Sequence, residues 1–414
     1  MNTIENAIEL ETRYSAHNYA PLPVVLTRGQ GAHLWDTAGR RYVDMMSAYS
    51  AASHGHGHPR ILAALTAQAE RLAVPSRAYY TDRLGPFLAE LCTLAALDAA
   101  LPMNTGAEAV ETAIKAARRW GYRVKGIARD RAEIIVAAGN FHGRTTTAVS
   151  ASTEPDYRDG FGPFTPGFRA VAFGDLAAVE RAITPQTAAV LVEPIQGEAG
   201  IIVPPAGWLA GLRRICDAHG VLLILDEVQS GLGRTGAWFA FEHEGVRPDG
   251  LILGKALGGG VLPVSAFLGT REVMDVFTPG SHGSTFGGNP LAAAVGLEAL
   301  RVIEEEGLVG RSRVLGAHML ERLRAIESPA VRAVRGRGLW AAVEIDPRFA
   351  SARSVCERLI EKGVLSKETH HTVVRLAPPL VIAQDDLDWA LDRLEETIRE
   401  LAPARELAPA GAAA

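Results

Sequence analysis

Short aliphatic runs alternate with longer amphipathic stretches along most of the chain, and this alternation limits the possible folds most strongly. The candidate strands share a high content of Val, Ile and Leu; they are Ala100–Met103, Glu133–Ala137, Arg169–Ala172, Ala188–Val192, Val221–Asp226, Gly250–Gly254 and Ser265–Gly269. The candidate helices are Pro59–Leu72, Arg83–Leu97, Ala107–Arg123, Trp208–His219 and Pro290–Glu305. Buried strands linked by helices are typical of a parallel sheet. The pattern predicts an α/β fold with a mostly parallel central sheet flanked by helices.

The pattern changes after residue 300, which indicates a second, smaller domain. Its expected elements are helices near Val309–Ile326 and Ser351–Lys362, strands near Leu339–Ile345 and Val373–Leu376, and a last helix over Asp385–Leu401. We therefore expect a large domain over residues 51–300 and a smaller α+β domain over residues 301–402. Residues 1–50 are expected to form an N-terminal segment that packs with the smaller domain, and the Ala- and Pro-rich residues 403–414 a disordered tail.

Composition argues against several classes of partner. The 414 residues carry 42 basic and 47 acidic side chains, a net charge of −5, so the chain lacks the positive field that nucleic acids require. Its three cysteines are too few for a secreted disulfide framework or a four-cysteine zinc site. The acidic stretch Met1–Tyr14 does not resemble a signal peptide, and no apolar run approaches the ~20 residues that span a bilayer. We expect a cytoplasmic enzyme that acts on small molecules.

Two ionisable residues that could take part in catalysis stand at the ends of consecutive candidate strands. Asp226 closes the candidate strand within the run VLLILDE, and Lys255 closes the run DGLILGK. Ligands of parallel α/β sheets bind beyond the carboxyl ends of the strands, so both side chains should point into one crevice. Pyridoxal phosphate needs a lysine for its aldehyde and a carboxylate near its pyridine nitrogen. A lone lysine at a strand end is usually a solvated cap, so the interpretation depends on the neighbouring motifs.

Two glycine-containing motifs are candidates for binding the phosphate. In NTGAEA, Asn104–Ala109, a strand ends and a helix begins, and free amides at a helix start favour an anion. A plain capped helix start explains this motif equally well. In GSTFGGNP, Gly283–Pro290, Ser284 and Thr285 offer hydroxyls on a loop before another helix.

Other functions find less support. A P-loop is excluded by spacing, because Gly250 and Gly254 enclose three residues and Ala256 stands where Ser or Thr is required. His54, His56 and His58 alternate along the chain but lack the pattern of a metal hydrolase. A non-catalytic protein or a nucleotide-binding protein remains a remote alternative, because a fold alone does not confer activity.

Many longer strings resemble the class III aminotransferases, pyridoxal-phosphate enzymes of fold type I, and within that family the enzymes that act on ornithine. The strings occur in family order and are HNYAPLPV, YSAASHGHGHP, LPMNTGAEAVETAIKAARRWGY, GNFHGRT, GFGPFTPGF, VEPIQGEAG, LDEVQSGLGRTG, LGKALGGG, HGSTFGGNP and RLAPPLVI. They extend over nearly the whole chain, which makes the match far more specific than any single motif.

The resemblance implies a role for each matching residue. Lys255 would form the covalent imine with pyridoxal 5'-phosphate and move the proton, and Asp226 would hold the protonated pyridine nitrogen. The other implied cofactor contacts are Gly106 and Ala107 at the phosphate, Phe141 and Val228 on the two ring faces, Gln229 at the ring hydroxyl, and Thr285 at the phosphate of the neighbouring subunit. A contact from the neighbour implies a homodimer, or a larger homo-oligomer, with the site at the interface.

Substrate choice is implied by fewer residues. Glu198 would cover Arg375 in one half-reaction and release it in the other, when the guanidinium binds the α-carboxylate of glutamate or 2-oxoglutarate. Tyr19 and Arg144 match positions that hold the α-amino acid end of ornithine, and Tyr49 matches the position that separates ornithine enzymes from their relatives.

The function implied is transfer of the δ-amino group of L-ornithine to 2-oxoglutarate, giving glutamate and glutamate-5-semialdehyde, which cyclises to pyrroline-5-carboxylate. The alternative is another class III ω-aminotransferase acting on 4-aminobutyrate, N-acetylornithine or another diamine. One residue departs from the pattern: His142 stands where many ornithine enzymes carry tryptophan, so the shape and pH response of the pocket can differ.

Overall fold

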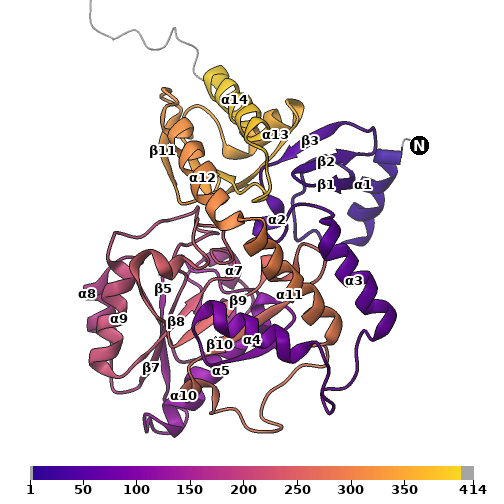
Figure 1. The fold of residues 1–414 in the computed structure, drawn as a ribbon. Helices are drawn as coiled ribbons and strands as arrows, with labels where there is room; N and C mark the ends of the chain where they lie inside the picture. The colour runs from indigo at the N-terminus through magenta and orange to yellow at the C-terminus, as the bar shows by residue number, and fades with distance from the viewer. Residues whose placement is uncertain (1–2, 402–414) are drawn as a thin grey trace, which may run out of the picture.

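A seven-stranded sheet forms the centre of the larger part of the molecule in the computed structural model, which describes residues 3–401 (Figure 1). Its strands, in chain order, are β4 (Ala99–Met103), β5 (Glu133–Ala137), β6 (Phe168–Val171), β7 (Thr187–Val192), β8 (Leu222–Asp226), β9 (Gly250–Leu253) and β10 (Ser265–Gly269). Their order in the sheet is β4-β10-β9-β8-β7-β5-β6. β10 runs antiparallel to both of its neighbours, and all other adjacent pairs are parallel. The predicted mostly parallel sheet is confirmed.

The aliphatic runs arise because this sheet is buried on both faces. Ile134 and Val136 of β5 pack into one apolar cluster, whereas Ile135 packs into another on the opposite face. Side chains alternate between the faces of a strand, so a strand covered on both sides needs apolar residues at every position.

Helices cover the sheet and connect its strands. Those associated with it are α3 (Pro59–Arg71), α4 (Leu84–Ala95), α5 (Gly106–Arg123), α6 (Thr146–Ala151), α7 (Pro155–Arg158), α8 (Leu176–Ala182), α9 (Trp208–His219), α10 (Arg271–Met274) and α11 (Pro290–Glu305). α5 packs against β7, β9 and β10 and begins with a capping box in which Thr105 and Glu108 bond each other's backbone amides. Its first turn therefore starts at a fixed place beside the carboxyl ends of β8 and β9.

A second, antiparallel sheet follows in the last third of the chain. Its order is β11-β12-β15-β14, formed by β11 (Val331–Gly336), β12 (Ala341–Ile345), β14 (Lys367–Thr369) and β15 (Val373–Leu376). The helices of this part are α12 (Leu308–Arg324), α13 (Ala352–Glu361) and α14 (Gln384–Leu401). Figure 1 shows them gathered at the end of the molecule away from α10.

The N-terminal residues form elements that the sequence did not predict. They are α1 (Thr3–Tyr14), β1 (Leu26–Gln30), β2 (His33–Asp36), β3 (Arg41–Asp44) and the single turn α2 (Ser47–Ser50). β3 pairs in parallel with β13 (Val364–Leu365), so this small sheet contains strands from both ends of the chain.

The C-terminal tail and membrane-spanning segments were the two remaining subjects of prediction. The expected tail over residues 403–414 lies outside the described residues. Between residues 3 and 401, none of the helices combines the length and the apolar character that crossing a bilayer requires.

Candidate functional site

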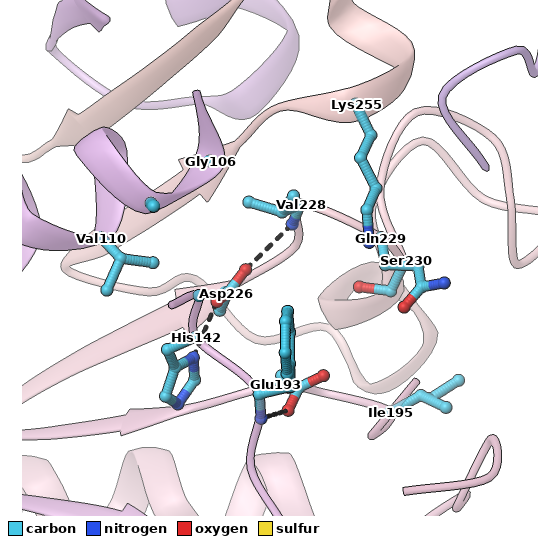
Figure 2. A pocket seen from close by; sticks show the side chains of 13 residues that line it. Gly106, Val110, His142, Glu193, Ile195, Asp226, Val228, Gln229, Ser230 and Lys255 are labelled. Carbon is cyan, nitrogen blue, oxygen red and sulfur yellow. Dashed lines mark hydrogen bonds and ion pairs between the residues drawn. The ribbon is translucent and has the colours of Figure 1, made fainter. Parts of the chain in front are cut away.

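A cavity of about 660 Å³ opens at the carboxyl ends of β8 and β9. It brings together residues that lie far apart in the sequence; its lining is Gly106, Ala107, Val110, Phe141, His142, Gly143, Glu193, Ile195, Asp226, Val228, Gln229, Ser230 and Lys255. Every residue predicted to bind the cofactor is among them except Thr285. Figure 2 shows Lys255 extending into this space toward Gln229 and Ser230.

Lys255 follows β9 directly and begins the short 3-10 helix Lys255–Gly258. Its φ of 43° lies in the left-handed region, which is costly for a residue with a side chain and is found mostly at functional sites. Burial lowers the pKa of the Lys255 amine, although the negative charges of Glu198 and Asp226 oppose the shift. A lowered pKa increases the fraction of neutral amine, which is the form that acts as a nucleophile or a base.

Asp226, the last residue of β8, forms a close pair with His142. Its Oδ2 lies 2.7 Å from His142 Nδ1, and its Oδ1 accepts the Val228 amide at 3.1 Å (Figure 2). Burial would lower the pKa of His142, but the hydrogen bond and charge of Asp226 outweigh burial and raise it. The histidine that departs from the family pattern is thus the direct partner of the predicted catalytic carboxylate.

The start of α5 forms one side of the cavity and leaves backbone amides available. The leading amides of a helix have no intrahelical partners, and Thr105 caps that of Glu108, which leaves those of Gly106 and Ala107. A Cβ on Gly106 would lie 3.0 Å from Val228 Cγ1, so this close approach favours glycine. Asn104 Nδ2 donates to Ser284 Oγ at 2.8 Å, which brings the second predicted phosphate motif to the same helix start.

Glu193 is a site residue that the sequence analysis missed. Its Oε1 accepts the Phe141 amide at 2.9 Å, and its Oε2 accepts the Gly197 amide at 3.2 Å. Burial raises the pKa of Glu193 to about 7, against the opposing charge of His142. This carboxylate therefore ties the loop of Phe141 to the loop that carries Glu198. Its position within the string VEPIQGEAG was the only available signal.

The predicted switch residues form an ion pair beside the cavity. Arg375 Nη1 lies 2.8 Å from Glu198 Oε2, and the Arg375 guanidinium carbon lies 4.9 Å from the centre of the Tyr49 ring. Arg375 is only 4% exposed, so its charge depends on such partners. Burial raises the pKa of Tyr49, and the charge of Arg375 opposes the shift.

Tyr49 lies on a turn of left-handed backbone. Residues 47–50 contain no glycine, yet all have φ between 42° and 74°. Left-handed backbone costs roughly 1–2 kcal/mol per such residue, so the surroundings must hold it. Asp44 Oδ1 accepts the amides of Met46 and Ser47, and the fully buried Arg234 donates to Ser47 Oγ at 3.2 Å.

The remaining predicted substrate and cofactor residues lie outside the cavity lining. The Arg144 guanidinium carbon lies 3.7 Å from the centre of the Tyr157 ring and 5.3 Å from that of Phe141. Tyr19 is 77% exposed in the single chain. Thr285 is exposed and lines a separate surface hollow with Arg77 and Ser284.

The three alternating histidines do not converge. His54 bonds the carbonyl of Ala299, His56 the carboxylate of Asp44, and His58 the carboxylate of Glu306. Among the described residues, no group of three or more His, Cys, Asp and Glu side chains is arranged to hold a metal ion.

The chemistry of the cavity suits pyridoxal phosphate. The cavity offers an amine for the aldehyde and a buried carboxylate for the pyridine nitrogen. It also offers free amides at a helix start for the phosphate and an apolar wall at Val228 for one face of the ring.

Comparisons with known proteins agree with this geometry. The chain is 56% identical to the ornithine aminotransferase of Exiguobacterium sp. over 404 residues, which are 98% of this chain and 99% of the relative. It is 46% identical to the Toxoplasma gondii ornithine aminotransferase, whose structure is described as having partial occupancy of PLP at the active site; the TM-score is 0.95, over 96% of this chain and 95% of that one.

The acetylornithine aminotransferase of Elizabethkingia anophelis is 45% identical with a TM-score of 0.87, over 97% of this chain and all of that one. The family model described as Aminotransferase class-III matches residues 14–398. This chain belongs to the class III aminotransferase family.

Proposed function

We propose that this protein transfers the δ-amino group of L-ornithine to 2-oxoglutarate, with pyridoxal 5'-phosphate as cofactor. The products are glutamate and glutamate-5-semialdehyde, which cyclises to pyrroline-5-carboxylate. The observation that carries the proposal is the Glu198–Arg375 pair of 2.8 Å beside Tyr49, next to the cavity of Lys255 and Asp226. The 56% identity to an ornithine aminotransferase supports the same substrate.

The residues of the cavity divide the binding of the cofactor among them. Gly106 and Ala107 would donate amides to the phosphate, Asp226 would keep a proton on the pyridine nitrogen, and Gln229 would contact the ring hydroxyl. Phe141 and Val228 would pack against the ring. Once bound, the protonated pyridine withdraws electrons from the substrate carbon that loses its proton.

Lys255 holds the cofactor and then moves the proton. Burial lowers the pKa of its amine, which favours the neutral form that can take a proton from the δ-carbon of ornithine. The amine lies at the end of β9 on a constrained backbone, which limits its reach to the cavity.

Arg375 serves one half-reaction and is covered in the other. Paired with Glu198, it cannot attract the α-carboxylate of ornithine, so Tyr19, Tyr49 and Arg144 orient ornithine with its δ-amine inward. When Glu198 moves away, Arg375 binds the α-carboxylate of glutamate or 2-oxoglutarate through two hydrogen bonds.

The proposal extends to assembly and location. An exposed Thr285 beside Arg77, near the exposed Tyr80 and Phe286, supports a homodimer in which Thr285 reaches the neighbour's phosphate.

The pairing of β3 with β13 supports an N-terminal segment (1–50) that packs with the small domain (301–402), next to a large cofactor domain (51–300). Three free cysteines, two of them buried, suit the reducing cytoplasm.

Two experiments test the function. Reduction of the holoenzyme with borohydride, followed by peptide mapping, should leave the cofactor attached at Lys255; attachment elsewhere contradicts the assignment. Mixing the holoenzyme with ornithine, 4-aminobutyrate or N-acetylornithine should bleach the cofactor absorbance fastest with ornithine. The second candidate is N-acetylornithine, favoured by the 45% identity to the Elizabethkingia enzyme, and a faster reaction with it would replace ornithine.

A further inference from the structure

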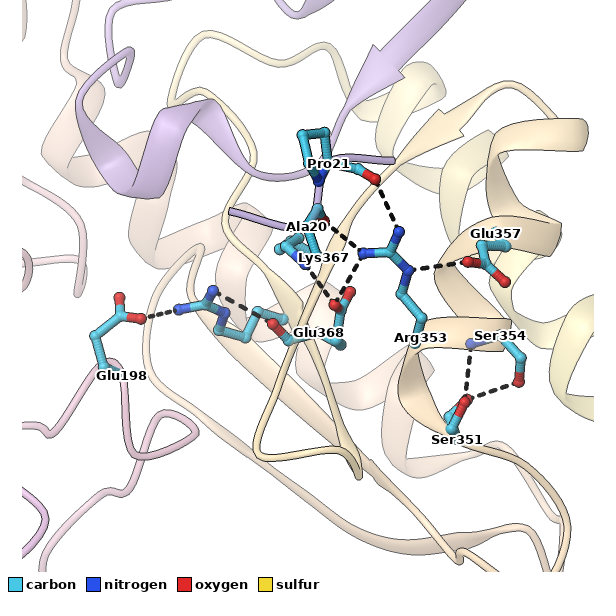
Figure 3. Close-up of polar contacts among 10 residues, drawn as sticks. Ala20, Pro21, Glu198, Ser351, Arg353, Ser354, Glu357, Lys367 and Glu368 are labelled. Carbon is cyan, nitrogen blue, oxygen red and sulfur yellow. Dashed lines mark hydrogen bonds and ion pairs between the residues drawn. The ribbon is translucent and has the colours of Figure 1, made fainter. Parts of the chain in front are cut away.

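The segment that carries Tyr19 is held in place by one arginine of the C-terminal part. The segment between α1 and β1 contains no helix or strand. Arg353 Nη1 donates to the carbonyl of Ala20 at 2.8 Å, and Arg353 Nη2 donates to the carbonyl of Pro21 at 2.9 Å (Figure 3). The two carbonyls belong to the two residues that follow Tyr19.

Arg353 is itself fixed from three directions. It lies in the first turn of α13, which Ser351 caps by accepting the Ser354 amide at 3.1 Å. Its Nε donates to Glu357 at 2.9 Å, and its Nη1 also donates to Glu368 at 3.3 Å. Its side chain is 28% exposed, so these contacts are partly shielded from water.

The short strand β14 connects this anchor to the predicted switch. The carboxylate of Glu368 accepts a hydrogen bond from Arg353 and also pairs with Lys367. The backbone carbonyl of Glu368 accepts from Arg375 Nη2 at 3.5 Å. The next residue, Thr369, donates through Oγ1 to the carbonyl of Glu198 at 2.8 Å. One three-residue strand thus contacts the Arg353 anchor, Arg375 and the backbone of Glu198. Figure 3 shows Glu368 facing Arg353.

We propose that Arg353 is a positioning residue for the ω-amino substrate, which fixes the Tyr19 segment relative to the Arg375–Glu198 pair. The inference rests on the proposed function and adds Arg353 to the residues that determine its substrate specificity. Arginine is required because its planar fork reaches two backbone carbonyls and two carboxylates at once, which a lysine ammonium cannot reproduce. Glutamate binds through Arg375, which Arg353 reaches only indirectly through Glu368 and which keeps its own bond to Glu198, so the glutamate half-reaction depends less on this anchor.

The matched variants are Arg353→Ala, Arg353→Lys, and Arg358→Ala as a control at an exposed position of the same helix. In the holoenzyme, R353A should lower the specificity constant for the ornithine half-reaction by about tenfold or more, mainly through KM, because misplacing a binding group loses orientation. The glutamate half-reaction should change by less than about twofold, R353K should recover only part of the loss, and R358A should match wild type. Equal losses in both half-reactions, or full recovery in R353K, would overturn the proposal.

Two further measurements separate positioning from general damage. Chymotrypsin cleaves after tyrosine, so cleavage after Tyr19 should accelerate in R353A and not in R358A; an unchanged rate contradicts the anchoring. In a double-mutant cycle, R353A should add little to the fall in the specificity constant for ornithine that Tyr19→Ala causes. If the two losses multiply instead, the residues act independently, and a role of Arg353 through Tyr19 is refuted. If wild type fails to react with ornithine, the proposed function fails, and the proteolysis still decides whether Arg353 anchors the segment.

Discussion

Glu198 and Arg375 form a partly buried ion pair with 2.8 Å between Oε2 and Nη1, and their side chains are 19% and 5% exposed. The cation that could bind an α-carboxylate is therefore already occupied by a residue of the protein. Charged hydrogen bonds of this kind contribute roughly 1.5–3 kcal/mol, which is enough to suppress a competing ligand.

Replacing Glu198 with Gln should free Arg375. The variant keeps the shape of the side chain but removes its charge, so we expect the KM for 2-oxoglutarate to fall by about tenfold. The specificity constant for ornithine should fall, because Arg375 then also attracts the α-carboxylate of ornithine in the wrong orientation. Steady-state kinetics with both substrates measures the two effects.

Glu298→Gln is the matched control for this prediction. Glu298 pairs with Arg60 at 2.7 Å, and neither residue lines the cavity. Its kinetic constants should stay at wild-type values. An unchanged KM for 2-oxoglutarate in E198Q would show that Glu198 does not restrict Arg375.

Replacing Asp226 with Asn should separate cofactor binding from turnover. Asparagine fills the same volume but lacks the charge that keeps a pyridine nitrogen protonated, so we expect kcat to fall by a factor on the order of 10³ while the cofactor is retained. Absorbance of the purified variant measures the bound cofactor, and an ornithine assay measures kcat.

Asp249→Asn tests whether any partly buried carboxylate beside this sheet has the same effect. Asp249 precedes β9 and accepts the Leu223 amide at 2.7 Å, away from the cavity lining. Loss of the Asp249 charge should lower the free energy of unfolding without a comparable fall in kcat. Near-normal kcat in D226N would contradict the role given to Asp226.

Tyr157 should matter for ornithine through Arg144. The Arg144 guanidinium carbon lies 3.7 Å from the centre of the Tyr157 ring, and such cation–π contacts contribute roughly 0.5–2 kcal/mol. We expect Tyr157→Leu to raise the KM for ornithine several-fold to about tenfold. Tyr157→Phe keeps the ring and should remain close to wild type, so a similar KM in both variants would exclude this contact from substrate binding.

The central sheet and the position of Asp226 and Lys255 at its edge were predictable from sequence. The strands are almost wholly apolar because both faces are covered. Asp226 ends β8 and Lys255 comes shortly after the adjacent parallel strand β9, so a single topological rule brings them together. Glycine motifs at Gly106 and Gly283 marked the helix starts and loops near that edge.

Features that depend on distant residues were not predictable. The left-handed turn that carries Tyr49 has the sequence SAYS, without a glycine to signal it, and is held by Asp44 and Arg234. The reversed direction of β10 leaves no mark in its composition, which matches that of the parallel strands. The contact of His142 with Asp226 spans 84 residues, and only the fold creates it.

His54 is a fully buried histidine whose Nε2 lies 3.0 Å from the Ala299 carbonyl oxygen. Because the partner is a carbonyl oxygen, Nε2 carries the proton and donates. Burial lowers the pKa of His54 from 6.5 to about 4. Between these values the unfolded chain binds a proton that the folded chain excludes, so the free energy of unfolding falls as the pH drops from 6.5 to 4.

The shift corresponds to about 3 kcal/mol lost across this range, since one pKa unit is about 1.4 kcal/mol. Burial raises the pKa of Glu193 and that of Glu227 to about 7, and both act in the opposite direction, so the wild-type profile mixes these effects. His54→Gln keeps a donor for Ala299 but does not titrate. The difference in urea-unfolding free energy between wild type and H54Q should therefore shift by about 3 kcal/mol in favour of the variant from pH 6.5 to pH 4. A difference that stays constant over this range would show that His54 binds a proton in the folded protein as readily as in the unfolded chain.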